Sequence, residues 1–295
     1  MRLSTLVPSL ALACILVSPA HGQELADGLF DGGKLLATGG VSQIEGAGGG
    51  GLASWAMITG YGTRDGVGAN IHYTAVPLPD YGLQSAGLAV GLFDRLELSY
   101  AWQEFDTRDV GAALGLGRGF AFHQNIFGAK LKLIGDAVYD QDSWLPEISA
   151  GLQHKENDRG AVIAAVGGKG SVGTDYYLAA SKLFLAESLL VNLTLRETKA
   201  NQLGILGFGG DKHNDYSSQF EGSAAYLISR QFAVGAELRT KPSNLSVAHE
   251  GAAWDLFAAY FFNKNLSLTA AYADLGNIVI RNRQQGAYLS LQAGL

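Results

Sequence analysis

The sequence predicts an all-β fold: a transmembrane antiparallel β-barrel of about 14 strands, with short periplasmic turns and longer extracellular loops. Of its 295 residues, 47% are hydrophobic and 16% are charged, against roughly 25% charged in a typical soluble domain. After the N-terminal segment no apolar run is long enough for a membrane-spanning helix. Segment after segment instead alternates apolar and polar residues, which is the period of a β-strand.

The first 22 residues are typical of an export signal. Arg2 supplies a positive charge, Leu3 to Val17 is mostly apolar, and small residues follow up to Gly22. We expect a cleaved signal peptide over 1–22 and a single barrel domain over 23–295. Cys14, the only cysteine, would leave with the signal, which excludes disulfides and thiolate chemistry in the mature chain.

A glycine-rich segment over 33–51 opens the mature chain. It is predicted either as the first strand or as a plug folded inside the barrel. The second possibility would leave 12 strands in the wall, so both counts stay open at this point.

The following segments show the alternation most clearly. Leu96, Leu98 and Tyr100, for example, alternate with Glu97 and Ser99. Strands of about 9 to 11 residues suit a bilayer, and they must close into a ring because unpaired backbone groups are costly in hydrocarbon. The predicted strands are 34–44, 52–60, 67–75, 82–92, 95–105, 119–134, 146–156, 173–185, 188–199, 217–229, 231–241, 251–262, 265–275 and 285–295.

The connections alternate in length. Four are very short, and the polar segments between them are long, which is the outer-membrane arrangement with the short turns in the periplasm. The alternation requires 157–172 to be one outer loop, with Ala161–Val166 as a helical turn inside it. The short connections are 93–95, 186–188, 229–231 and 263–265, and the long ones are 106–118, 200–216, 242–250 and 276–284.

The last strand resembles the signal that the outer-membrane assembly machinery reads: a polar residue, a glycine and then alternating hydrophobics. Its final residue is leucine rather than the commoner phenylalanine. The residues concerned are Gln284, Gly286, Leu289, Leu291 and Leu295.

Polar side chains on the inward faces are the candidate functional residues. Matching Ile228 with Phe232 across their turn places Glu221 opposite Arg239 and Ser223 opposite Glu237, and opposed unlike charges on neighbouring strands support each other. The mixture of signs suits a small, weakly selective pore or a lumen bridged shut. The predicted lumen-lining residues are Glu97, Lys130, Lys132, Glu147, Lys155, Lys182, Asn192, Arg196, Glu221, Glu237, Arg239 and Asp255.

Other chemistry has little support. The histidines are scattered without metal-ligand spacing, so no metal or cofactor is predicted. His123 and Asn125 share one strand face and could form the relay of an outer-membrane hydrolase, but nothing singles out a serine. The chain carries a net charge of −6 and no basic cluster, which excludes a nucleic-acid partner. Aromatic residues near the predicted strand ends suit interfacial girdles: Trp102, Tyr226, Trp254, Tyr260, Phe262 and Tyr272.

Three stretches carry a resemblance to a family. Gly33–Gly46 followed by a glycine run and Trp55, then Asp175–Phe184, and then Arg196–Gly210 are similar to a proteobacterial family known as domain of unknown function 3034. The resemblance covers nearly all of the mature chain. It implies an exported protein of the outer membrane and carries no substrate or catalytic residue.

The leading functional hypothesis is a passive pore or transporter for small solutes in the outer membrane of a Gram-negative bacterium. Its channel is expected to be narrow, or to be plugged by 46–51 or by the 200–216 loop. Its partners would be outer-membrane lipids and the assembly machinery. A closed-lumen barrel that acts through its extracellular loops is the first alternative, and an outer-membrane hydrolase is the second.

Overall fold

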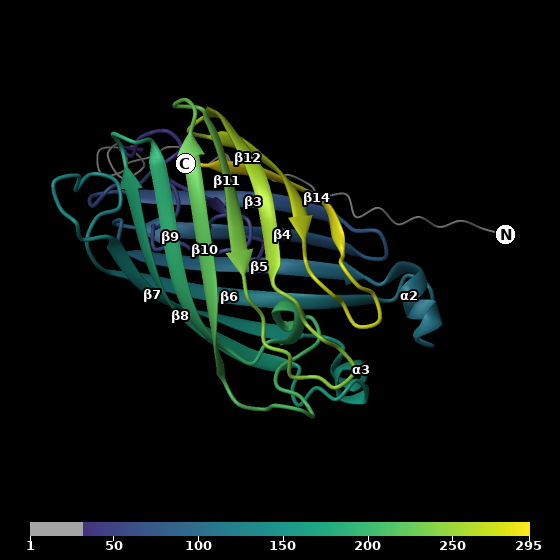
Figure 1. Cartoon of the computed structure of the whole chain (residues 1–295). Coiled ribbons are helices and arrows are strands. Elements are labelled where there is room, and N and C mark those ends of the chain that lie inside the picture. Colours follow the sequence, from purple (N-terminus) through teal and green to yellow (C-terminus); the bar gives the residue numbers. More distant parts are fainter. Residues whose placement is uncertain (1–31) are drawn as a thin grey trace, which may run out of the picture.

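The computed structural model describes residues 32–295, so the predicted signal peptide and its cleavage site lie outside the described residues. Twelve antiparallel strands form a closed barrel (Figure 1) in which each strand pairs with its neighbours in the sequence and β14 pairs with β3. The strands are β3 (Val67–Pro77), β4 (Gly82–Leu92), β5 (Leu96–Asp106), β6 (Ala121–Ile134), β7 (Glu147–Asn157), β8 (Val172–Phe184), β9 (Leu189–Thr198), β10 (Ser217–Leu227), β11 (Phe232–Arg239), β12 (Ala253–Asn263), β13 (Leu266–Asp274) and β14 (Gln285–Gly294).

The count of 14 strands is wrong, and the alternative of 12 with the N-terminal segment inside is correct. The predicted strands over 34–44 and 52–60 contribute only β1 (Val41–Ser42) and β2 (Gly48–Gly49), which pair with each other and not with the wall. The physical reason is burial, because residues 38–62 are buried on every side, whereas a wall strand exposes every second side chain. The other 12 predicted strands match the wall, with ends within two residues.

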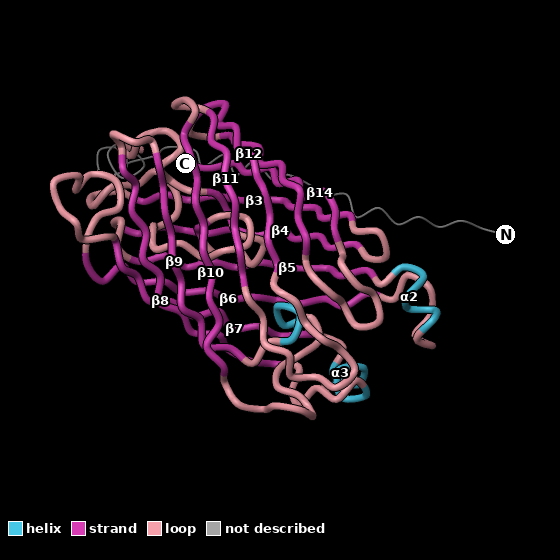
Figure 2. Tube along the Cα trace, in the orientation of Figure 1, coloured by secondary structure: helices cyan, strands magenta, loops and turns pink. Residues whose placement is uncertain are grey.

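The two ends of the barrel differ in their connections. One end, called here the loop end, carries the long segments 107–120, 158–171, 199–216, 240–252 and 275–284, together with the short 78–81. Helices α2 (Arg108–Ala113) and α3 (Gly160–Ala165) lie there (Figure 2), and α3 corresponds to the predicted helical turn. The opposite end, called the turn end, has connections of a few residues except for 135–146, and it also holds the C-terminus.

The outer surface of the wall is apolar. Along β3, for example, Ile71 and Tyr73 are about half exposed, whereas their neighbours Asn70, His72 and Thr74 are buried in the lumen. This is the inverse of a soluble protein, in which the polar face meets water. No helix among residues 32–295 is both long and apolar enough to span a membrane. Four of the predicted girdle aromatics are clearly exposed on the outside: Tyr226, Tyr260, Phe262 and Tyr272.

An apolar cluster fills the interior at the loop end. Tyr81 stacks on Phe105 with ring centroids 5.1 Å apart, and side chains from the long loops, including Ile163 and Ile205, join the same cluster. Ile44 of the N-terminal segment also belongs to it. The barrel interior is therefore packed continuously from the N-terminal segment to the loops.

Candidate functional site

Residues 32–62, called here the plug, occupy the lumen and both enter and leave it at the turn end. Gly32 and Gly62 form an isolated β-bridge where the two ends of the plug meet. The ammonium of Lys264, in the turn between β12 and β13, donates a hydrogen bond to the carbonyl of Gly32. The amide of Tyr61 donates to the carbonyl of Leu295 at 3.2 Å. The plug is thus a loop inserted from one side.

The plug folds on itself. The Gln43 amide bonds the Ala47 carbonyl at 2.8 Å, and the Ile44 amide bonds the Gly51 carbonyl at 3.0 Å. For residues 38–59, every backbone-to-backbone hydrogen bond in the described structure stays within the plug. Its glycines permit close approach: a Cβ on Gly49 would lie 2.4 Å from the Ala53 carbonyl oxygen. The glycine run therefore reflects dense packing rather than a phosphate-binding loop.

Carboxylates of the wall hold the plug through its backbone amides. Glu97 accepts from Gly48 and from Thr59, both at 2.9 Å. Glu237 accepts from Leu52 at 2.7 Å, and Glu221 accepts from Ser54 at 2.7 Å. Hydrogen bonds to charged acceptors are stronger than neutral ones, so three wall side chains fix four plug amides.

Lys130 complements these carboxylates. Its ammonium donates to the plug carbonyls of Gly48, Trp55 and Met57 at 2.9, 3.1 and 2.7 Å. It also pairs with Glu97 at 2.9 Å. Because both charges are almost wholly buried, they must be satisfied inside the protein, and the plug supplies most of the partners.

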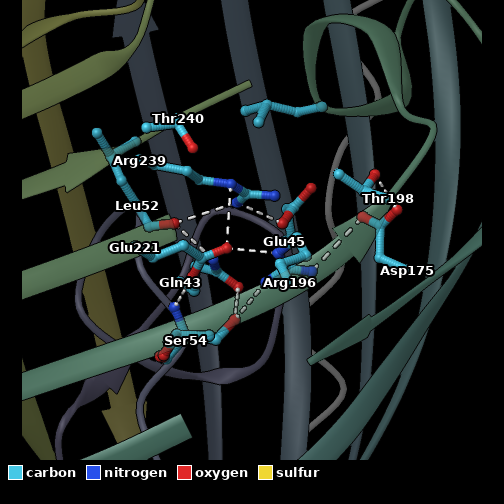
Figure 3. A network of polar contacts seen from close by, with 12 residues as sticks. Gln43, Glu45, Leu52, Ser54, Asp175, Arg196, Thr198, Glu221, Arg239 and Thr240 are labelled. Atoms are coloured by element: carbon cyan, nitrogen blue, oxygen red, sulfur yellow. Dashed lines mark hydrogen bonds and ion pairs between the residues drawn. The ribbon is translucent and has the colours of Figure 1, made fainter. Parts of the chain in front are cut away.

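Three acids and three bases form a buried network in the middle of the lumen, called here the central cluster (Figure 3). Glu45, on the plug, accepts from Arg239 at 2.7 Å and pairs with Lys155. The cluster thereby joins the plug to β7, β8, β9, β10 and β11. Its other pairs are Lys155–Asp175 at 2.7 Å, Arg196–Asp175 at 3.5 Å, Arg239–Glu221 at 3.3 Å and Arg196–Glu221.

The sequence-predicted lumen residues all lie on the inward faces, each less than a tenth exposed. The register places Glu221 opposite Arg239 and Ser223 opposite Glu237. Two of the residues, Lys132 and Glu147, sit apart at the turn end, 3.4 Å from each other. Lys182 is also near that end, where it donates to the carbonyls of Asp140 and Leu145. Asn192 donates to the Ser54 carbonyl at 3.1 Å.

Sequence reasoning missed two members of the central cluster. Glu45 is the only charged residue between Lys34 and Arg64. A single carboxylate in a glycine-rich segment is the feature that could have indicated a charged contact with the wall. Asp175 precedes two tyrosines and was assigned no role, although its carboxylate bonds both Lys155 and the Thr198 hydroxyl.

A second buried pair lies under the loops. Lys241 and Glu250 are 3.7 Å apart, and Glu250 accepts from the backbone amide of Gln202 at 2.8 Å. Burial raises the pKa of Glu250 to about 7, and Lys241 only partly opposes this. Burial also lowers the pKa of Lys241. The segment over 200–210 is itself buried, so this loop covers the lumen at the loop end.

His123 lies on the outer face with both ring nitrogens directed at carboxylates. Nδ1 is 2.9 Å from Asp158, and Nε2 is 3.5 Å from Glu104. Asn125 instead accepts from the Tyr100 hydroxyl at 2.8 Å. The relay through His123 and Asn125 is therefore not assembled. Within residues 32–295, no group of three or more His, Cys, Asp or Glu side chains is placed to hold a metal ion.

The profile of a family described as "Protein of unknown function (DUF3034)" matches residues 38–292, and no curated protein matches. Among solved structures, a KdgM porin is 12% identical with a TM-score of 0.48, covering 76% of this chain and 98% of its own. The COG4313 outer membrane channel from Pseudomonas putida F1 is 13% identical with a TM-score of 0.48, at 77% and 94% coverage. Outer membrane phospholipase A from Escherichia coli is 10% identical with a TM-score of 0.39, at 77% and 92% coverage. No function is transferred to this chain from these structures.

Proposed function

The chain belongs to the DUF3034 family of proteins of unknown function, and we propose that it is a gated outer-membrane channel for small polar solutes, with the plug as its gate. The turn end would face the periplasm and the loop end the outside. An export signal over 1–22 would deliver the chain.

The outer wall supports a membrane setting. Its outward side chains are mostly apolar, and the closed strand order leaves no unpaired edge, which is what hydrocarbon demands. On β14, Leu289 and Leu291 face outward and are about half exposed, as lipid contacts would be. Reading of this strand by the assembly machinery stays a prediction, as does the role of Gly286 and Leu295. Gln284 is buried and donates to Asp80 at the loop end.

One observation carries the gating proposal: the plug shares no ladder with the wall. Its two short strands form a sheet of their own. Side chains of the wall hold the plug by hydrogen bonds to its backbone. Withdrawal would therefore break no strand pairing of the barrel. Because both ends of the plug lie at the turn end, the segment could leave as a loop without threading.

The wall that withdrawal would uncover is polar and carries both signs of charge. Twelve strands enclose a narrower lumen than the 14 first predicted, since barrel diameter grows with strand number. Basic and acidic groups are interleaved in the central cluster, so we expect weak charge selectivity. Small polar solutes or ions are the cargo that such a passage accepts.

A plug-weakening variant tests the proposal. In Gly49→Ala the new Cβ would meet the Ala53 carbonyl at 2.4 Å, while Gly222→Ala, in the wall, meets nothing closer than 3.8 Å. Each folded mature chain is placed in a planar bilayer and its single-channel current is recorded. We expect rare openings in the wild type and in Gly222→Ala, and at least a tenfold higher open probability in Gly49→Ala.

A locked variant gives the reverse test. The Ala56 amide donates to the Ser181 hydroxyl at 2.8 Å, so the two residues are neighbours across the plug and β8. Cysteines are placed at both positions of the otherwise cysteine-free mature chain, and their oxidation to a disulfide is checked by the mass of the protein before the current is recorded. Oxidation should silence the double variant, and a reductant should restore its current. Neither single variant should respond. Silence of every variant, with barrels that still show heat-shifted gel mobility, would favour the closed-lumen alternative and refute the channel.

A further inference from the structure

Most of the buried carboxylates inside the barrel are paired with a base. Seven of the ten buried carboxylates among residues 32–295 take part in ion pairs. Asp274, at the end of β13, instead accepts hydrogen bonds from Gln285 and the Gly276 amide. Glu237 and Asp255 remain, and neither has a basic partner in the described structure.

These two carboxylates are neighbours. They lie directly opposite each other in the register of β11 and β12, where paired side chains on one face come within about 5 Å at their Cβ atoms. Glu237 uses its oxygens to accept from Leu52 and Ser223. Both oxygens of Asp255 lack any hydrogen-bond partner in the described part of the chain. The two carboxyl groups therefore face one another at 3% and 1% exposure, and neither pairs with a base among residues 32–295.

A third oxygen converges on the same point. The hydroxyl of Tyr288, on β14, is buried and likewise lacks a hydrogen-bond partner among the described residues. The position that a Cβ on Gly51 would take lies 3.3 Å from this hydroxyl and 3.5 Å from Asp255 Oδ2. Both oxygens therefore lie close to Gly51, in the part of the plug called here the plug tip (residues 50–52).

We propose that Glu237, Asp255 and Tyr288 bind a divalent cation of the calcium type at the plug tip. An all-oxygen set is what a hard cation selects, and Ca²⁺ tolerates irregular geometry and mixed ligands, whereas Mg²⁺ requires a near-ideal octahedron. The two carboxyl groups can together supply the two negative charges that neutralise one divalent ion.

The site would couple the ion to the plug. Glu237 holds the amide of Leu52, and a Cβ on Gly50 would collide with the same carboxylate. A bound cation would therefore fix the plug tip against β11, β12 and β14. Binding does not require that the barrel conducts, so its test is independent of the current recordings.

The experiment measures binding and stability on the folded mature chain after treatment with a chelator. Tb³⁺ should luminesce on excitation of tyrosine, and Ca²⁺ should displace it. Ca²⁺ should also raise the midpoint temperature of thermal unfolding above that of the sample with chelator. Na⁺ or Mg²⁺, added to the same concentration of positive charge, should not raise it. Asp255→Asn should lose both effects, and Asp142→Asn, on the exposed 135–146 segment, should keep them.

Gly51→Ala provides a second variant that leaves every charge in place, and it should weaken Tb³⁺ binding at least tenfold by filling the site. Luminescence that persists in Asp255→Asn would place the ion elsewhere and overturn the proposal. A midpoint that responds to pH but not to Ca²⁺ would assign the missing charge to a proton and would also overturn it.

Discussion

The wall and the plug of this protein are held by different kinds of bond. Each wall strand is bonded to its neighbours by backbone hydrogen bonds in continuous registers, such as the 11 residue pairs between β3 and β4. The plug is bonded to the wall by side chains that bind its backbone, for example Glu97 and Lys130. The position of the plug therefore depends on a few charged side chains, and substituting them leaves the backbone hydrogen bonds of the barrel intact.

Energetically the two regions should also respond differently to substitution. A buried ion pair adds little net stability because desolvation offsets the attraction, but removal of one partner leaves an uncompensated buried charge. The central cluster therefore specifies where the plug sits more than it stabilises the fold. Three variants or conditions test this contrast.

The largest effect should come from Glu45→Gln. It leaves Arg239 and Lys155 short of one carboxylate, and loss of a buried partner costs about 3–5 kcal/mol. We expect the plug to undock at lower denaturant, seen as a shift in Trp55 fluorescence, while heat-shifted gel mobility of the barrel is unchanged. Glu187→Gln, in an exposed turn, serves as the control. Equal loss of barrel stability in Glu45→Gln would remove the distinction between the two regions.

The second-largest effect should come from a change of pH, which alters the stability of the loops at the loop end. The pKa of Glu250 is raised by burial from its usual 4.5 to about 7. Glu250 therefore stays protonated up to a higher pH in the folded protein than in the unfolded chain. The resulting stabilisation is fully present below pH 4.5 and is lost as the pH rises to 7. The difference is up to about 3 kcal/mol. Amide exchange over 200–210 should therefore be faster at pH 7.5 than at pH 5, after correction for the intrinsic rate.

Glu250→Gln keeps the hydrogen-bond acceptor and removes the titration. In that variant the corrected exchange should not vary over the same pH range. Exchange within the barrel strands should be independent of pH in both proteins. A pH effect that survives in Glu250→Gln would assign the titration to another group.

The smallest effect should come from Trp55→Phe. Its indole donates to the Ser223 hydroxyl at 2.8 Å, and a typical hydrogen bond contributes about 1 kcal/mol. We expect a thiol reagent to label a Ser54→Cys reporter about fivefold faster, because a loss of about 1 kcal/mol raises the population of the undocked plug by about that factor. Trp144→Phe, at an exposed position, should leave that accessibility unchanged. No change in Trp55→Phe would show that the plug is held by its charged contacts alone.

Much of the wall could be predicted from sequence because lipid and lumen impose opposite preferences on alternate residues. That pattern located 12 strands and placed Glu221 opposite Arg239. The plug could not be predicted in the same way, because a segment buried on all sides has no alternation, and a run such as Gly48–Gly51 carries no side chains to pattern. Asp255 was identified as inward-facing, but its lack of a partner depends on contacts with Gly51 and Tyr288 that only the folded barrel defines.

The seam between β14 and β3, with six residue pairs, joins the last strand to the strand that directly follows the plug. The plug, which precedes every wall strand in the sequence, is therefore fully surrounded only when the last strand pairs with the first. Closing that seam completes the ring around the lumen that the plug occupies, so a single strand pairing both finishes the wall and bounds the plug.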